Sequence, residues 1–192
     1  MLLLSRLLEA TSGSVFIDET NLREIPCDVL RQRLTVISQD PFILPGTLRY
    51  NLDSSGQSSD NAMLSALDMV GLKDSSTRQP YSFDLQVSDA TFSRGQRQLL
   101  SLARALLRRS TTKILVLDEI SGNVDIATER LMFQVIRDHF KHATVIAVTH
   151  RLRCIRDFDQ IVIMEDGCIV ETGAPADLLG MPSLFKQLWD EQ

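Results

Sequence analysis

The sequence predicts an α/β protein with a mostly parallel sheet. First, short apolar and β-branched runs alternate with stretches of helical periodicity from residue 111 onward. Second, the run at 114–117 is continuously apolar and ends in two acidic residues, which is typical of a central parallel strand, and the run at 144–148 predicts a further strand. Ligands of such sheets bind at the carboxyl ends of the strands, so the residues that follow each run direct the search for a site.

Four elements are predicted before residue 40, each from its local pattern. They are the end of a helix at 2–8, a short strand at 14–18, a helical or turn-like segment at 22–33, and a buried strand at 34–38. The third of these contains Pro26, which is a signal for the start of a helix.

The middle of the chain is predicted to be helical and loosely packed. It comprises a serine-rich loop at 53–61, a helix from Ala62 that ends at Gly71, and a polar, irregular stretch at 73–90. A longer helix with one apolar face follows at 93–109.

The remaining elements complete the α/β pattern. A helix is predicted at 126–139, a hairpin around the turn at 165–167, and helical structure at 175–190. We therefore predict one domain over 1–192, with an α/β core at 1–46 and 111–192 and a helical subdomain at 47–110.

Composition excludes several classes of protein. Among the 192 residues, 44% are hydrophobic and 23% are charged, which is ordinary for a folded chain and excludes wholesale disorder. The 20 Lys and Arg against 25 Asp and Glu argue against a general nucleic-acid binder. No apolar run approaches the ~18 residues of a membrane helix, and no signal peptide is recognised. Three scattered cysteines indicate reduced thiols of an intracellular protein.

Two acidic residues, Asp118 and Glu119, end the apolar run at 114–117. A carboxylate at a strand end can hold Mg²⁺, and a second carboxylate nearby can orient and deprotonate a water molecule. The alternative is an acidic cap at the start of a helix.

The segment that opens the helix at 93–109 has the character of a phosphate site. Ser93 suits a helix N-cap, Gly95 allows close approach to the backbone, and a helix N-terminus favours an anion. Residues 90–113 also contain six basic residues and no acidic one. The alternative is a capped surface helix with a solvated arginine face.

Two further polar residues follow predicted strands. His150 could donate a hydrogen bond to a phosphate oxygen or support a nucleophilic water, or it could be an ordinary half-buried histidine. Gln39 could bind a metal ion or water through its amide, although alone it indicates only a turn.

The order of these motifs resembles the ATP-binding cassette (ABC) ATPase domain. The matching positions are the Q-loop Gln39, the signature motif at 92–96, the Walker B pair Asp118 and Glu119, the D-loop at 121–125, and the switch histidine His150. The stretches at 39–42, 46–53 and 96–107 are most similar to the second nucleotide-binding domain of the C subfamily, the multidrug-resistance-associated type.

The resemblance implies a P-loop NTPase-like core, ATP and Mg²⁺ as ligands, and roles for individual residues. Asp118 would hold Mg²⁺ through water, and Glu119 would be the general base. His150 would contact the γ-phosphate, while Gln39 would touch Mg²⁺ and sense the transport domain.

It also implies a composite site between two domains. The ATP-binding positions on this side are Ser93, Arg94, Gly95, Gln96 and Asp125, and the signature residues would face ATP on an opposing domain. The implied partners are a second nucleotide-binding domain and the transmembrane domains of an exporter, at the cytoplasmic face of a membrane. No nucleic acid is implied.

The sequence departs from the family pattern at the phosphate-binding loop. No Gly-x-x-x-x-Gly-Lys-Ser/Thr is present, and none of the four lysines follows a glycine. We therefore expect an N-terminally truncated domain without the first strands, beginning inside the helix that follows this loop, with weak or no ATPase activity in isolation. Arg94 also replaces the middle glycine of the signature motif.

Two other functions remain open on these residues. One is a non-hydrolytic remnant or regulatory half-site that only complements another ATPase domain. The other is an ABC ATPase of the translation or DNA-repair type, which usually has two cassettes or a coiled-coil insert. The sequence does not specify a transported substrate.

Overall fold

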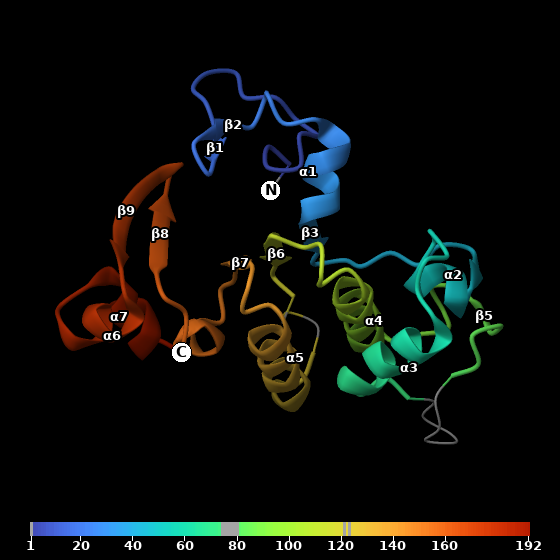
Figure 1. Cartoon of the computed structure of the whole chain (residues 1–192). Coiled ribbons are helices and arrows are strands. Elements are labelled where there is room, and N and C mark those ends of the chain that lie inside the picture. Colours follow the sequence, from blue (N-terminus) through green and yellow to red (C-terminus); the bar gives the residue numbers. More distant parts are fainter. Residues whose placement is uncertain (1, 74–80, 121, 123) are drawn as a thin grey trace. The chain divides into compact units, whose positions relative to one another are not determined.

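The computed structural model describes residues 2–73, 81–120, 122 and 124–192 (Figure 1). The chain forms two compact units, Met1–Ile146 and Ala147–Gln192. The first contains most of the predicted α/β core together with the helical segment, and the second begins within the last strand of the sheet.

A three-stranded sheet has the order β3 (Leu34–Ile37), β6 (Ile114–Asp118) and β7 (Thr144–Val148). β3 and β6 are parallel, and Ile37 is paired with Leu117. The central position of β6 explains its continuous apolar run, because Leu115, Val116 and Leu117 are almost wholly inaccessible to solvent. The predicted α/β fold with a parallel sheet is confirmed.

Three helices of the first unit begin where the sequence predicts. α1 (Cys27–Arg33) starts after Pro26 and runs directly into β3, α4 (Arg94–Leu107) is capped by Ser93, and α5 (Ile126–His139) is capped by Asp125. A buried hydrogen bond of 2.8 Å between the Thr35 and Thr112 hydroxyls ties β3 to the segment before β6.

Two shorter helices of the predicted helical subdomain pack on one side of α4. α2 (Leu48–Leu52) and α3 (Asp60–Met69) both pack against α4, which also contacts β3 (Figure 1). β4 (Gly46–Thr47) and β5 (Gln86–Val87) form a short antiparallel ladder that joins the two ends of the segment containing these helices. The sequence did not predict this ladder. Part of the predicted irregular stretch, 74–80, lies outside the described residues.

The predictions for the first 21 residues are partly wrong. Residues 2–8 form turns and no helix: Arg6 has φ = 49°, which a helix does not accept. The leucines of this segment are largely exposed, so no packing supports a helix that short. Of the predicted strand at 14–18, only Phe16–Ile17 form a strand, β1, which pairs with β2 (Thr20–Asn21) across a turn.

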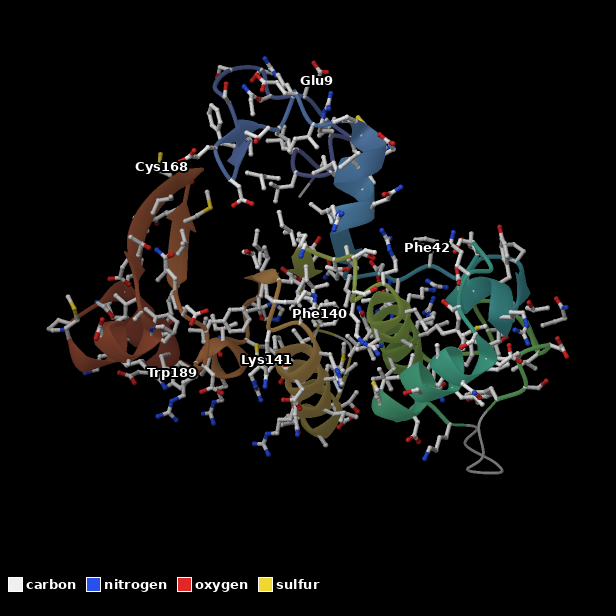
Figure 2. The ribbon with its side chains drawn as sticks, viewed as in Figure 1. Glu9, Phe42, Phe140, Lys141, Cys168 and Trp189 are labelled. Carbon is white, nitrogen blue, oxygen red and sulfur yellow. The ribbon has the colours of Figure 1, made fainter. Side chains whose placement is uncertain are left out.

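The second unit contains a hairpin, two short α-helices and a 3₁₀ helix (Figure 1). β8 (Ile161–Glu165) and β9 (Cys168–Gly173) are joined by Asp166 and Gly167, both at positive φ, as the turn signal predicts. Figure 2 shows Cys168 at the far end of this hairpin from the helix that carries Trp189.

The predicted helical stretch at 175–190 is two helices, α6 (Pro175–Gly180) and α7 (Leu184–Asp190), which follow the short 3₁₀ helix η1 (Leu152–Ile155). The first helix ends at Gly180, and Ser183 caps the second by accepting from the backbone N–H of Lys186, while its hydroxyl donates to the oxygen of Leu178 in α6. The core of this unit is the cluster of Ile155, Ile161, Leu178 and Phe185.

No helix among the described residues is long and apolar enough to cross a membrane.

Candidate functional site

The first part of the site lies where β3 and β6 end. Ile37 is opposite Leu117, and continuing the same register by two residues places Gln39 opposite Glu119. Their side chains meet: the Nε2 of Gln39 donates a hydrogen bond of 3.0 Å to the Oε2 of Glu119. Two predicted site residues that are 80 positions apart in sequence are thus direct neighbours.

The backbone of Glu119 has an unusual conformation. Its φ is 46°, in the left-handed region that residues other than glycine rarely occupy and that costs roughly 1–2 kcal/mol. Its carbonyl accepts a hydrogen bond from Gly122 at 3.2 Å, which turns the chain away from the sheet. Because of this turn, Glu119 no longer follows the alternating side-chain directions of the strand. Asp118 is the last residue of β6 and is partly exposed.

The second part of the site is the start of α4. The hydroxyl of Ser93 accepts from the backbone N–H of Gln96 at 3.2 Å, and the side chain of Gln96 accepts from the N–H of Ser93 at 2.9 Å. This capping box confirms the predicted N-cap. Both polar side chains therefore form hydrogen bonds within the start of the helix, and Arg94 and Gly95 make up its first turn.

A pocket of about 430 Å³ lies between the starts of α4 and α5. It is lined by Ser93, Arg94, Gly95, Gln96, Leu99, Val124, Asp125 and Thr128. Both helices are 14 residues long, and both begin at the pocket, but the carboxylate of Asp125 already accepts from the first N–H groups of α5. The α4 side of the pocket combines three features of anion sites: a helix N-terminus, an arginine and a glycine.

Asp125 is the N-cap residue of α5. Its Oδ1 accepts from the N–H groups of Ala127 and Thr128 at 2.9 and 3.0 Å, and its Oδ2 accepts from the Thr128 hydroxyl at 2.6 Å. The Thr128 side chain and then its backbone N–H lower the pKa of Asp125. The carboxylate therefore stays ionised at neutral pH. Two neighbours that belong to the predicted D-loop, Ser121 and Asn123, lie outside the described residues.

Two contacts near the site were not foreseen. Arg94 reaches Asp40 at 3.7 Å, which connects the first turn of α4 to the residue after Gln39. Gln98 is wholly buried and donates to the backbone of the same segment. Opposite charges at 40 and 94 were visible in the sequence, but only tertiary structure brings them together.

The alternative of a solvated arginine face on α4 is wrong for Arg104. Its guanidinium donates to the backbone oxygens of Asn51 and Phe42 at 2.5 and 2.9 Å, and to the Oδ1 of Asn51 at 2.8 Å. It also lies over the Phe42 ring, 5.5 Å from the centroid, on the segment between β3 and α2 where Figure 2 labels Phe42. Burial lowers the pKa of Arg104.

His150 belongs to the second unit, two residues after β7. Its backbone oxygen accepts a hydrogen bond from the side chain of Gln192, whose Oε1 accepts from the N–H of Leu152 at 3.0 Å. The loop that carries the histidine is thus held by the end of the chain's last helical segment.

The strand ends offer oxygen donors of the kind that Mg²⁺ requires. The amide of Gln39 and the carboxylate of Asp118 supply them, and magnesium is usually held by one or two such groups together with substrate phosphates. Among the described residues there is no cluster of three or more His, Cys, Asp or Glu that could hold a metal by itself. This donor set fits Mg²⁺ with a phosphate substrate better than a metal held by protein alone.

Comparison with known proteins identifies the class. The family described as "ABC transporter" matches residues 1–122, and the chain belongs to this family. The resemblance to the ABC ATPase domain is thereby confirmed.

Individual relatives narrow the resemblance to the C subfamily. The chain is 42% identical over 184 residues to human "ATP-binding cassette sub-family C member 2", and 40% identical over 185 residues to "ABC transporter ecdL" of Aspergillus rugulosus. These alignments cover 95% and 96% of the chain but 12% of each relative's length, so the chain spans about an eighth of them.

A solved structure confirms the fold. The chain superposes on a bacterial Atm1-family ABC exporter, whose structure is described as having ATP bound, with a TM-score of 0.90 and 27% sequence identity. The match covers all of this chain and 34% of the exporter chain.

Proposed function

We propose that this chain is part of a nucleotide-binding domain that binds and hydrolyses ATP at a composite dimer site and so drives export across a membrane. The observation that carries the proposal is the contact between Gln39 and Glu119 at the ends of two parallel strands. It places the amide of Gln39 and the carboxylate of Glu119 at the carboxyl ends of parallel strands, where ligands of α/β proteins bind.

Glu119 is the general base in this proposal. Hydrolysis needs a water molecule held in line with the γ-phosphate, and a carboxylate can orient that water and accept its proton. The Oε2 of Glu119 accepts the hydrogen bond from Gln39, which orients the carboxylate at the ends of the two strands. The left-handed backbone of Glu119 is consistent with a functional strain of this kind.

Asp118 and Gln39 hold Mg²⁺ in this proposal. The ion, when bound with ATP, neutralises charge that develops on the phosphate oxygens. His150 contacts the γ-phosphate as a hydrogen-bond donor after closure of the site.

The pocket at the start of α4 binds the γ-phosphate of ATP held by a second nucleotide-binding domain. Ser93, Arg94, Gly95 and Gln96 form its wall on one side, and Asp125 lies on the other. Transfer of the Ser93 and Gln96 side chains from their capping hydrogen bonds to a phosphate would make closure depend on ATP.

The same proposal assigns the partners and the location. They are a second nucleotide-binding domain and transmembrane domains, with residues 47–110 acting as a helical subdomain that faces the membrane part at its cytoplasmic side. The Tyr50 side chain of this region is about half exposed, and Phe42 just before the region is largely exposed, which suits a contact surface.

A second function is favoured by one observation, the lack of a Gly-x-x-x-x-Gly-Lys-Ser/Thr motif in the sequence. A polypeptide of these residues would then act as a non-hydrolytic half-site that supplies α4 to an intact ATPase domain.

The test is ATP-dependent association with an intact nucleotide-binding domain, followed by analytical ultracentrifugation. We expect Mg²⁺ and ATP to produce a heterodimer with the wild-type chain and not with Ser93→Ala. Ser59→Ala is the matched control, because Ser59 caps α3 through the same kind of hydrogen bond, to Ala62, away from the pocket. Absence of ATP-dependent association with the wild-type chain, or equal loss in both variants, would contradict the proposal.

A further inference from the structure

Gln98 is a buried polar residue in α4 that the proposed mechanism does not use. Its exposure is 0%, and it lies one turn after Gly95 on the helix that begins with the signature residues. Buried amides require hydrogen-bond partners, so its contacts indicate what the residue does.

The amide nitrogen of Gln98 holds the backbone just beyond β3. Nε2 donates to the carbonyl oxygen of Gln39 at 2.7 Å and to that of Ser38 at 3.1 Å. The ladder of β3 ends at Ile37, so these two carbonyls have left the sheet. Gln98 supplies the hydrogen bonds that the sheet no longer provides, and it fixes the backbone from which the Gln39 side chain extends.

The amide oxygen of Gln98 shows that packing alone does not explain this residue. It is buried and has no hydrogen-bond donor in the part of the chain that the structure describes. An unsatisfied buried acceptor destabilises a fold, whereas an apolar side chain of similar length would fill the same space without this penalty.

We propose that Gln98 is a positioning residue that sets the Gln39–Glu119 contact, an inference that rests on the proposed function. Its hydrogen bond of 2.7 Å fixes the Gln39 backbone, and the Gln39 side chain then reaches Glu119 at 3.0 Å. Because Gln98 and Ser93 belong to one rigid helix, a movement of α4 when phosphate binds at its start is transmitted to the general base.

The test uses NMR on the ¹⁵N-labelled 192-residue chain without nucleotide, so its outcome does not depend on ATP binding or hydrolysis. The signal observed is the side-chain amide of Gln39. Glu119→Ala defines its position when the contact is lost. Gln98→Met keeps the side-chain length and removes the donor.

We expect Gln98→Met to move the Gln39 signal to its position in Glu119→Ala and to lower its order parameter below about 0.6, the range of flexible groups. Thr35→Val is the matched control, because it removes a buried hydrogen bond from the same strand without touching residues 38–40. It should lower thermal stability and leave the Gln39 signal unchanged.

An unchanged Gln39 signal in Gln98→Met would overturn the proposal, even if thermal stability falls, since Gln98 would then be only structural. If Gln98→Met does not fold, Gln98→Asn withdraws the amide by one methylene and carries the same expectation. If neither folds while Thr35→Val does, the role of Gln98 is structural and the proposal fails. Failure of the heterodimer test alone would leave this result intact and would remove only the proposed ATPase role.

Discussion

Replacing Arg104 of α4 should destabilise the first unit more than replacing Arg108, the arginine that directly follows this helix. The change is Arg104→Met, which keeps most of the aliphatic stem and removes the guanidinium. That group donates three hydrogen bonds to Asn51 and Phe42 and lies over the Phe42 ring. It joins α4 to two segments more than 50 residues away in sequence.

The magnitude follows from these contacts. A hydrogen bond from a charged group contributes roughly 1.5–3 kcal/mol, but three bonds from one guanidinium are not additive. The Asn51 side chain also keeps its own bonds to Leu44 and Thr47, so the Phe42–Asn51 segment is not released altogether. We therefore expect a loss of about 3 kcal/mol in the free energy of unfolding.

Urea denaturation followed by circular dichroism measures this loss. Arg108→Met is the matched control: Arg108 is the residue that directly follows α4, is exposed, and donates a hydrogen bond to the Arg31 oxygen at 2.7 Å. Its loss should stay below about 1 kcal/mol. Arg104→Lys should recover only part of the stability, because a lysine cannot reproduce the planar fork. A difference between Arg104→Met and Arg108→Met under about 0.5 kcal/mol would refute the reasoning.

Three further predictions concern pH, activity and the second unit. Partial burial raises the pKa of Asp53, but hydrogen bonds from Ser55 and Ser58 outweigh it and hold the pKa well below its usual range. This stabilisation is present above the unfolded pKa of about 4 and is lost as the pH falls toward the native pKa, so the stability difference between wild type and Asp53→Asn should shrink in acid denaturation series. The 192-residue chain should release phosphate from Mg²⁺-ATP weakly or not at all in a colorimetric assay, because its sequence contains no Gly-x-x-x-x-Gly-Lys-Ser/Thr motif to bind the phosphates, and normal turnover would contradict this. Phe185→Ala should lower the free energy of unfolding by about 3–5 kcal/mol, because the ring is wholly buried in the hydrophobic core of the second unit. Fluorescence of Trp189, the only tryptophan and 5.9 Å from that ring, reports the transition, and a midpoint unchanged from wild type would show that Phe185 does not support this core.

Elements whose identity is local were predictable from the sequence. Residues 126–139 and 144–148 form the predicted helix and strand with the predicted bounds, since a capping aspartate precedes the helix and the strand is an almost uninterrupted apolar run. The hairpin turn at 165–167 was equally local, because Asp and Gly accept the positive φ that such a turn needs.

Two of the predicted helices are wrong, for different reasons. The leucines at 2–8 suggested a helix, but their side chains have too little to pack against, and the segment forms turns. The predicted C-terminal helix is divided after Gly180, because Pro182 has no backbone N–H and disfavours a helical residue before it, and Ser183 then caps a new helix. The first error reflects the dependence of short helices on tertiary packing, and the second reflects a local signal that was not used.

By itself, the sequence determined the α/β class, the ABC resemblance and the identity of the candidate site residues, because order and spacing of motifs are properties of the chain. Only the tertiary structure decided three contacts: Gln39 donates to Glu119, Arg94 lies near Asp40, and Gln98 donates to the backbone oxygen of Gln39. Those contacts join residues 54 to 80 positions apart, and they arise from the register of β3 with β6 and the packing of α4 against β3. No local pattern encodes such distances, since they depend on how buried surfaces fit together.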